Sequence, residues 1–412
     1  MTTPQNANQS GRPAHHLVMA GLNQLIEPND VAAGALLELM SPEELLALIG
    51  RRDHLPLGLN ERLTEITGQR PAQGSAQDLS VALSRWRKRL EFSDAHAALD
   101  AMERCGGGIL TAQDPQWPQQ LDELGFGRPL CLWWRAGIPD NLGTVSAQNS
   151  ISIVGSRDAS DYGNQVTFEL ARALGERGYC IVSGGAYGID AVAHRAALSH
   201  EQWSFPYPAT ITIVAGGADR LYPAGNHALL QQIIAHGVLF SEVPAGTSPT
   251  RFRFLNRNRL IAAFSQLTII TEARHRSGAL NTASHAVDLG REVAAIPGSV
   301  FSPNSAGTHK LIRSGSAELI SSPADVEQLL GATTVGEIPI DVEKDPREHR
   351  TDGLPAEVAM VFDVLSYAKV LSVDEICARS GISVMNTLRA LSYLAQRNLA
   401  TDQEMGWKLR HS

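Results

Sequence analysis

The sequence predicts an α/β protein whose main domain is a doubly wound, mostly parallel sheet, with a small helical domain before it and a winged-helix domain after it. Two observations carry this prediction. Between residues 150 and 330, short β-branched runs alternate with amphipathic segments of helical length. These runs are apolar on both faces, as expected for parallel strands covered by helices on both sides. The 412 residues also suffice for roughly two to three domains.

Composition excludes several classes of protein. No apolar run approaches the ~20 residues that a membrane-spanning helix needs, so we expect a cytoplasmic protein without membrane contact. Residues 1–16 hold Arg12 as their only lysine or arginine and are expected to be a disordered tail, not a targeting peptide. The four cysteines lack a C-x-x-C spacing, which argues against a disulfide framework and against a zinc site.

The N-terminal third of the chain is predicted to be helical. Over residues 17–105, "HLVMAGLNQLI" and "ALLELMSPEELLALIG" carry apolar residues at helical spacing. Ser41 followed by Glu44 has the form of a capping box. Residues 106–149 contain several prolines and are expected to be a connector, with two tryptophans packed on the next domain.

The remaining elements follow from the alternation of strand-like and helix-like segments. Residues 331–354 are charged and lack periodicity, so they are expected to be a linker. Residues 355–412 are predicted to form three helices and a β-ribbon, the order of a winged helix-turn-helix. The predicted strands of the main domain are "SISIVGS", "YCIVSGG", "TITIVAGG", "VLFSE", "QLTIITEA", "REVAAIPGS" and "AELIS".

Glycine-rich turns follow the first two predicted strands of the main domain. Ligands of open α/β sheets bind beyond the carboxyl ends of the strands, where glycines let the backbone approach a phosphate. Gly155-Ser156-Arg157 and the "SGGAYGID" stretch therefore indicate an anion site, although each turn could also be a tight βα connection without a ligand. Neither the dinucleotide-binding nor the P-loop glycine pattern is present.

The stretch "FRFLNRNRL" concentrates arginines in a chain whose net charge is −8. Phe252 or Phe254 could stack on an unpaired base, and guanidinium groups pair with phosphate, so the pattern favours single-stranded nucleic acid. The competing interpretation places the phenylalanines in the core and pairs the arginines with carboxylates. The arginines between residues 251 and 276 are Arg251, Arg253, Arg257, Arg259, Arg274 and Arg276, against Glu272 as the sole acid.

The acidic residues near these turns do not form a recognisable catalytic or metal site. Asp190 and Glu272 have no partner visible in the sequence, and each could order an arginine or cap a helix. Asp190 and His194 share a helix face, but no third ligand is identifiable. We therefore expect no catalytic residues, no metal and no cofactor.

Several blocks of the main domain resemble the DNA-processing protein A family (DprA, also called Smf). "IVGSR", "VSGGAYGIDAVAHRAAL", "GGADRLYPAGN", "RNRLIAAFS", "EARHRSGALNTASHA", "GREVAAIPGS" and "SAGTHKLIRSGSAELI" occur in the family's order between Ile153 and about Ile320. The resemblance implies an extended Rossmann-like domain between a helical, SAM-like domain and a winged helix. It implies a non-enzymatic homodimer that binds and protects single-stranded DNA and helps load the RecA recombinase during natural transformation.

The resemblance and the turn chemistry together nominate a set of residues. The "GSR" motif makes Arg157 a phosphate-binding residue, and the "F-x-x-R-N-R" block makes Phe254 a base-stacking candidate. Those expected to contact phosphate or DNA are Gly155, Ser156, Arg157, Ser183, Gly184, Gly185, Gly188, Phe254, Arg257, Asn258, Arg259, Arg276, Ser277 and Gly278. Three positions depart from the family pattern: Tyr187 in place of arginine, Leu255 in place of proline and His309 in place of asparagine. Tyr187 removes a charge but leaves a ring that could stack on a base.

Two other functions compete with this interpretation. Nucleotide phosphoribohydrolases of the LOG type use a similar fold with an arginine and a glutamate, here Arg157 and Glu272, but their "P-G-G-x-G-T-x-x-E" block is absent. A transcription regulator would read duplex DNA through the winged helix. Its presumed recognition helix, "VMNTLRALSYLAQRN", carries Arg389 and Arg397 among many apolar residues, which favours an auxiliary or protein-contact role.

Overall fold

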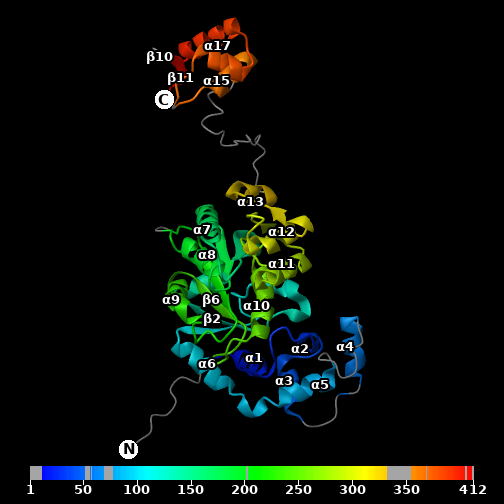
Figure 1. Ribbon diagram of the computed structural model, residues 1–412. Coiled ribbons are helices and arrows are strands. Elements are labelled where there is room, and N and C mark those ends of the chain that lie inside the picture. The colour runs from blue at the N-terminus through cyan, green and yellow to red at the C-terminus, as the bar shows by residue number, and fades with distance from the viewer. Residues whose placement is uncertain are drawn as a thin grey trace, which may run out of the picture. The chain divides into compact units, whose positions relative to one another are not determined.

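The computed structural model describes residues 12–51, 56, 58–68, 78–200, 203–331, 354–367, 369–403 and 406–410. The chain divides into two compact units, Met1–Ala332 and Thr333–Ser412 (Figure 1). The predicted linker falls almost wholly on residues 332–353, and most of the predicted tail on residues 1–11. Both stretches lie outside the described residues.

The first unit begins with six helices. The capping box is confirmed: the Ser41 hydroxyl accepts from the Glu44 amide, and the Glu44 carboxylate accepts from the Ser41 amide. The first helix starts earlier than predicted, at Ala14, where Pro13 is the N-cap residue and Arg12 pairs with Asp100. The six helices are α1 (Ala14–Leu25), α2 (Val31–Leu37), α3 (Pro42–Gly50), α4 (Leu59–Thr67), α5 (Leu79–Arg87) and α6 (Ala95–Arg104).

A nine-stranded sheet of order β1-β2-β6-β5-β4-β3-β7-β8-β9 forms the centre of this unit. All seven predicted strands are present, and they pair in parallel. The strands are β1 (Gly107–Leu110), β2 (Leu132–Ala136), β3 (Ser150–Val154), β4 (Cys180–Ser183), β5 (Thr210–Val214), β6 (Val238–Ser241), β7 (Leu267–Ile270), β8 (Glu292–Ala295) and β9 (Glu318–Leu319). The sheet is a Rossmann-like α/β fold, as predicted.

The segment predicted as a connector contributes two strands to this sheet. β1 pairs with β2, and β2 pairs with β6, both antiparallel. Trp133 is fully buried, and its indole nitrogen donates to the Asn23 side chain of α1 at 2.8 Å. The segment therefore forms an edge of the sheet and also ties the helical segment to it.

Helices cover both faces of the sheet (Figure 1). Strands β4, β5 and β6 extend from β3 in one direction, and β7, β8 and β9 extend in the other, so the strand order reverses between β3 and β7. The helices are α7 (Asp161–Glu176), α8 (Ile189–Ala197) and α9 (His227–His236) on one face and α10 (Arg251–Phe264) and α11 (Gly278–Asp288) on the other, followed in the chain by α12 (Ala306–Arg313) and α13 (Pro323–Leu329).

The second unit has its own core. Among its described residues, three helices and a ribbon occur in the order predicted for a winged helix, and Leu371 bridges to Trp407 of the ribbon. The elements are α15 (Ala356–Val364), α16 (Val373–Ser380), α17 (Val384–Gln396), β10 (Ala400–Gln403) and β11 (Gly406–Leu409). Throughout the described residues of both units, every helix is too short or too polar to cross a membrane.

Candidate functional site

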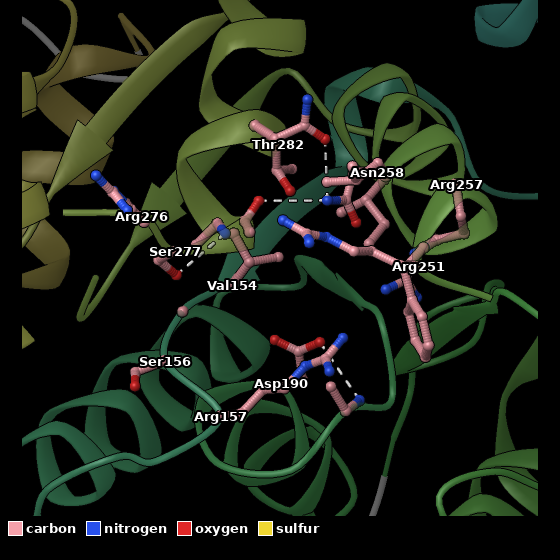
Figure 2. Close-up of a pocket in the computed structure, with 18 of the residues that line it drawn as sticks. Val154, Ser156, Arg157, Asp190, Arg251, Arg257, Asn258, Arg276, Ser277 and Thr282 are labelled. Carbon is pink, nitrogen blue, oxygen red and sulfur yellow. Dashed lines mark hydrogen bonds between the residues drawn. The ribbon is translucent and has the colours of Figure 1, made fainter. Parts of the chain in front are cut away.

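A pocket of about 820 Å³ opens where the strand order reverses. Ligands of doubly wound sheets bind at this kind of reversal, beyond the carboxyl ends of the strands. The loops after β3 and β7 form its walls, together with α10 and the start of α11. Nine of the predicted residues line it: Gly155, Ser156, Arg157, Phe254, Arg257, Asn258, Arg276, Ser277 and Gly278. Figure 2 shows Arg157 and Asp190 on one side, with Asn258 and Thr282 across from them.

Phe254 occupies the centre of a cluster of cationic and aromatic side chains. The Arg157 guanidinium carbon lies 4.6 Å from the centroid of the Phe254 ring, and that of Arg257 lies 5.8 Å away. The Tyr222 ring is 6.2 Å from the same ring at a tilt of 54°. Phe254 is only partly buried, so part of the ring faces the pocket. Phe254, the predicted base-stacking residue, therefore lies beside two arginines that were predicted to contact phosphate, Arg157 and Arg257.

Three exposed arginines of the pocket are available to an anion. Among the residues that the structure describes, Arg157, Arg251 and Arg276 make no ion pair and no side-chain hydrogen bond. The N-termini of α10 and α11 also reach the pocket through Thr250 and Gly278, and helix N-termini favour negative charge. The pocket therefore combines mobile positive charges with fixed backbone dipoles.

Of the six arginines between residues 251 and 276 that were predicted to pair with phosphate, four have partners within the protein, which corrects that prediction: Arg253, Arg257, Arg259 and Arg274. Arg259 is 3% exposed and forms a two-pronged ion pair with Glu242, with its Nη1 2.7 Å from Oε2. Its Nε and Nη2 also donate to the Gly127 carbonyl oxygen. Arg253 pairs with Glu27, just beyond α1. Arg259 does not line the pocket, because α10 turns it toward the helical segment.

Arg257 lies beneath the pocket. Its guanidinium donates to the carbonyl oxygens of Gly184, at 2.8 Å, and Ile213, while its Nε is buried without a partner. Burial lowers the pKa of Arg257 to about 10, which leaves it cationic at neutral pH. The nearby Asp190 carboxyl is 6% exposed; burial raises its pKa, against the opposing effect of Arg257. Arg257 thus fixes the glycine turn after β4 and supplies positive charge from below.

The glycine turns after β3 and β4 pack against each other. Gly188 has φ +72°, and a Cβ there would collide with the Ser156 carbonyl oxygen. The Ile189 amide donates to that oxygen at 3.1 Å. Ser183 is buried and donates to the Ile153 carbonyl oxygen. Ser183, Gly185 and Gly188 are absent from the pocket lining. At Gly188 the glycine permits close packing of the two loops, whereas at Gly185, where φ is +66°, a Cβ would meet the Thr212 hydroxyl of β5.

The acidic and histidine candidates have structural partners. Glu272 is 2% exposed, and its carboxylate accepts from the Ser160 hydroxyl at 2.6 Å and the Ser160 amide at 3.0 Å, at the start of α7. His194 is buried, and its Nδ1 lies 2.7 Å from the Thr210 hydroxyl oxygen. Within the described ranges, no three His, Cys, Asp or Glu side chains gather as a metal site would require.

Tyr222 and Thr282 are among the pocket residues that the sequence did not predict. Both line the cavity but belong to segments that were quoted only for their family resemblance. Tyr222 follows β5, so the rule that placed the turns after β3 and β4 at this rim could also have placed it. Of the departing residues, Leu255 lines the pocket, Tyr187 is 46% exposed on its rim, and the His309 ring lies 3.1 Å from the Gly298 carbonyl oxygen.

Comparison with known proteins connects this pocket to a family. The model of the family described as DNA recombination-mediator protein A matches residues 108–331. A putative DNA processing protein DprA of Mycobacterium tuberculosis is 40% identical over 332 residues, which cover 78% of this chain and 82% of that protein. The DNA processing protein DprA of Bacillus subtilis is 37% identical over 231 residues, covering 56% of this chain and 74% of that protein.

A solved structure agrees with these matches. The X-ray structure of DNA processing protein A from Streptococcus pneumoniae aligns with a TM-score of 0.55 at 28% identity, over 76% of this chain and 95% of that one. The matched range contains the whole sheet except its first residue, and all the loops that line the pocket. The chain belongs to the DNA recombination-mediator protein A family, the DprA family that its sequence resembles.

Proposed function

We propose that this protein binds single-stranded DNA at the pocket between β3 and β7, without catalysis, and delivers the strand to recombination. The observation that carries the proposal is the meeting of three unpaired arginines with a partly exposed phenylalanine in one pocket of about 820 Å³. Guanidinium groups pair with phosphate oxygens bidentately, and an aromatic face stacks on any unpaired base. A duplex hides its base faces, so it cannot use Phe254 in this way.

The strand is held by phosphate contacts that surround one stacked base. Arg251 starts α10, Arg276 precedes α11, and Arg157 follows β3, so the three charges approach the pocket from different elements. One monophosphate cannot use three guanidinium groups placed around a cavity of this size, whereas successive phosphates of a strand can. A base on Phe254 contributes about 1–3 kcal/mol.

The finer biological role follows from the family. Relatives are named for DNA processing, and the family for mediating recombination. We propose that the protein protects incoming single strands in the cytoplasm and helps load a RecA-type recombinase during natural transformation, acting as a homodimer. The second unit, whose element order suits a winged helix, has an auxiliary or protein-contact role in this proposal.

Fluorescence anisotropy across a salt series tests the proposal. Labelled single-stranded and duplex oligonucleotides are titrated with wild type, Arg157→Ala and Arg276→Ala. Arg172→Ala is the matched control, because Arg172 is an exposed arginine of α7 that pairs with Glu176 away from the pocket. Each pocket variant should weaken single-strand binding and reduce the slope of log K against log salt by about 0.7, while the control leaves both unchanged.

Equal affinity of wild type and both pocket variants for single strands would refute the site. The phosphoribohydrolase alternative is less well supported, because the Glu272 carboxylate that it requires is buried and accepts hydrogen bonds from Ser160. Incubation with nucleoside monophosphates checks it directly. Release of free base, lost in Glu272→Gln, would establish the hydrolase in place of the binding protein.

A further inference from the structure

Two exposed tyrosines stand on the rim next to the pocket, and the phosphate contacts proposed above do not use them. Tyr187, between β4 and α8, is 46% exposed, and Tyr222, which follows β5, is 51% exposed. Both line a second, smaller cavity. Arg157 and Phe254 line this cavity as well as the main pocket, so the two cavities adjoin.

The two rings are held in place by their surroundings. The Tyr187 hydroxyl oxygen accepts from the Gly225 amide at 3.1 Å. The ring rests on Gly225, where a Cβ would come within 2.8 Å of that oxygen, so a larger residue there would displace the ring. The Tyr222 ring contacts the Phe254 ring at a tilt, and the Arg157 guanidinium lies over the Phe254 ring. Rings fixed in this way lose little conformational freedom when a flat ligand stacks on them.

The size of the second cavity determines how a ligand uses it. Its volume is about 40 Å³, against about 820 Å³ for the main pocket. A cavity needs roughly 10–15 Å³ of such volume for each water, so it holds a few water molecules and cannot enclose a nucleobase. A base therefore lies against the exposed faces of Tyr187 and Tyr222 instead of entering between them.

We propose that Tyr187 and Tyr222 form a stacking platform for a second nucleobase, next to the one on Phe254. This inference rests on the proposed function and extends it: the strand runs from the arginines of the main pocket, past Arg157, onto the platform. Stacking on tyrosine tolerates every base, because each base has a π-face. The platform therefore adds affinity for single strands without sequence preference.

The shared arginine favours a nucleic acid over a protein as the occupant. Arg157 is exposed, lines both cavities and has no ion pair within the described part of the chain, so a ligand that crosses from one cavity to the other passes a cation. A polyanion with flat apolar groups at each repeat satisfies both the cation and the rings. An apolar peptide would leave the charge of Arg157 without a partner.

A comparison of two single strands, one with bases and one without, separates the contribution of stacking to affinity from that of charge. Anisotropy is measured with oligothymidine and with an abasic strand of the same length, for wild type, Tyr187→Ala, Tyr222→Ala and the ring-preserving Tyr187→Phe and Tyr222→Phe. The alanine variants should bind oligothymidine roughly 5- to 150-fold more weakly, with an unchanged salt slope and unchanged abasic binding. Tyr222→Phe should bind like wild type. Tyr187→Phe keeps the ring but loses the hydrogen bond from the Gly225 amide, so it should bind more tightly than Tyr187→Ala.

Replacing a tyrosine by arginine should have the opposite effect on binding, because it adds charge and removes the ring. Tyr187→Arg should steepen the salt slope by about 0.7 and reduce the preference for oligothymidine over the abasic strand. Both tyrosines are exposed, and thermal unfolding of each variant verifies that the fold is intact. If wild type binds and depends on Arg157, but the alanine variants retain full affinity for oligothymidine, the platform is refuted and the main site stands. If wild type does not bind single strands, the proposed function itself fails.

Discussion

The buried ion pair between Arg259 and Glu242 should stabilise the fold and should not contribute to DNA affinity directly. The two side chains are 3% and 6% exposed, and both guanidinium prongs meet the carboxylate. Glu242→Gln leaves the Arg259 cation buried opposite a neutral amide. Removing one partner of a buried pair costs about 3–5 kcal/mol. For a unit of this size, that loss lowers the unfolding midpoint by about 4–7 °C.

Trp133 is connected to the Arg259–Glu242 pair by hydrogen bonds. Trp133 donates to the side chain of Asn23, and Asn23 donates to the backbone carbonyl of Glu242. Trp133 is one of six tryptophans, so tryptophan fluorescence during thermal unfolding follows the unfolding of the chain with this region included. The double variant Glu242→Gln/Arg259→Met removes both charges and should recover much of the stability lost by either single variant.

A structural role and a phosphate-binding role for Arg259 predict opposite results. If the pair is structural, Arg259→Met lowers the unfolding midpoint, yet the folded variant retains the salt slope of wild-type DNA binding. An Arg259→Met variant with an unchanged midpoint and the reduced salt slope of Arg157→Ala would refute this reasoning and return Arg259 to the phosphate contacts.

Three further predictions concern the packing around the site. Burial lowers the pKa of His194 to about 3, so the histidine binds a proton more tightly in the unfolded chain than in the folded one. The free energy of unfolding should therefore fall as the pH drops below about 6.5, by up to 1.4 kcal/mol per pH unit. Urea titrations at several pH values measure this, and His194→Asn should remove the contribution. Gly188→Ala should cost more than about 1 kcal/mol in urea unfolding because of its φ of +72° and the collision with Ser156, while Gly278→Ala, with open space around it, should not. Thr250→Ala removes the N-cap of α10 and should cost about 0.5–2 kcal/mol by the same measurement.

The fold and the position of the site could be predicted from local patterns. Strands β3 to β7 are buried along their whole length, because both faces of the sheet are covered, and the β-branched and apolar residues that give this signal lie within a few positions of one another. The carboxyl-end rule then placed the turns after β3 and β4 at one rim. The antiparallel edge was missed because "LWWRA" is short and follows several prolines, so its pairing with β6, about 100 residues later in the chain, has no local signal.

The arginines of α10 could have been assigned more accurately from the sequence, because their helical spacing was available. The prediction grouped the arginines between residues 251 and 276 by their closeness in the sequence, although the helical period places neighbouring residues on different faces. Arg251, Phe254 and Asn258 follow spacings of three and four and line the pocket. Arg253 and Asn256 lie on another face and bind the segment just after α1. The carboxylate partners are separated from these arginines by up to 226 residues, so only the tertiary fold reveals which charges remain available.

A net charge of −8 and the proposed DNA-binding pocket predict an unusual dependence on ionic strength. Above about 0.1 M salt the Debye length is about 10 Å or less, so phosphates in the pocket respond mainly to Arg157, Arg251 and Arg276, and log K falls linearly with log salt. At about 0.01 M the Debye length reaches about 30 Å, and the acidic remainder of the molecule repels the strand. The plot should therefore flatten at low salt, and anisotropy titrations between these limits measure it. A line that stays straight to the lowest salt would show that the acidic surface lies too far from the bound strand to oppose it.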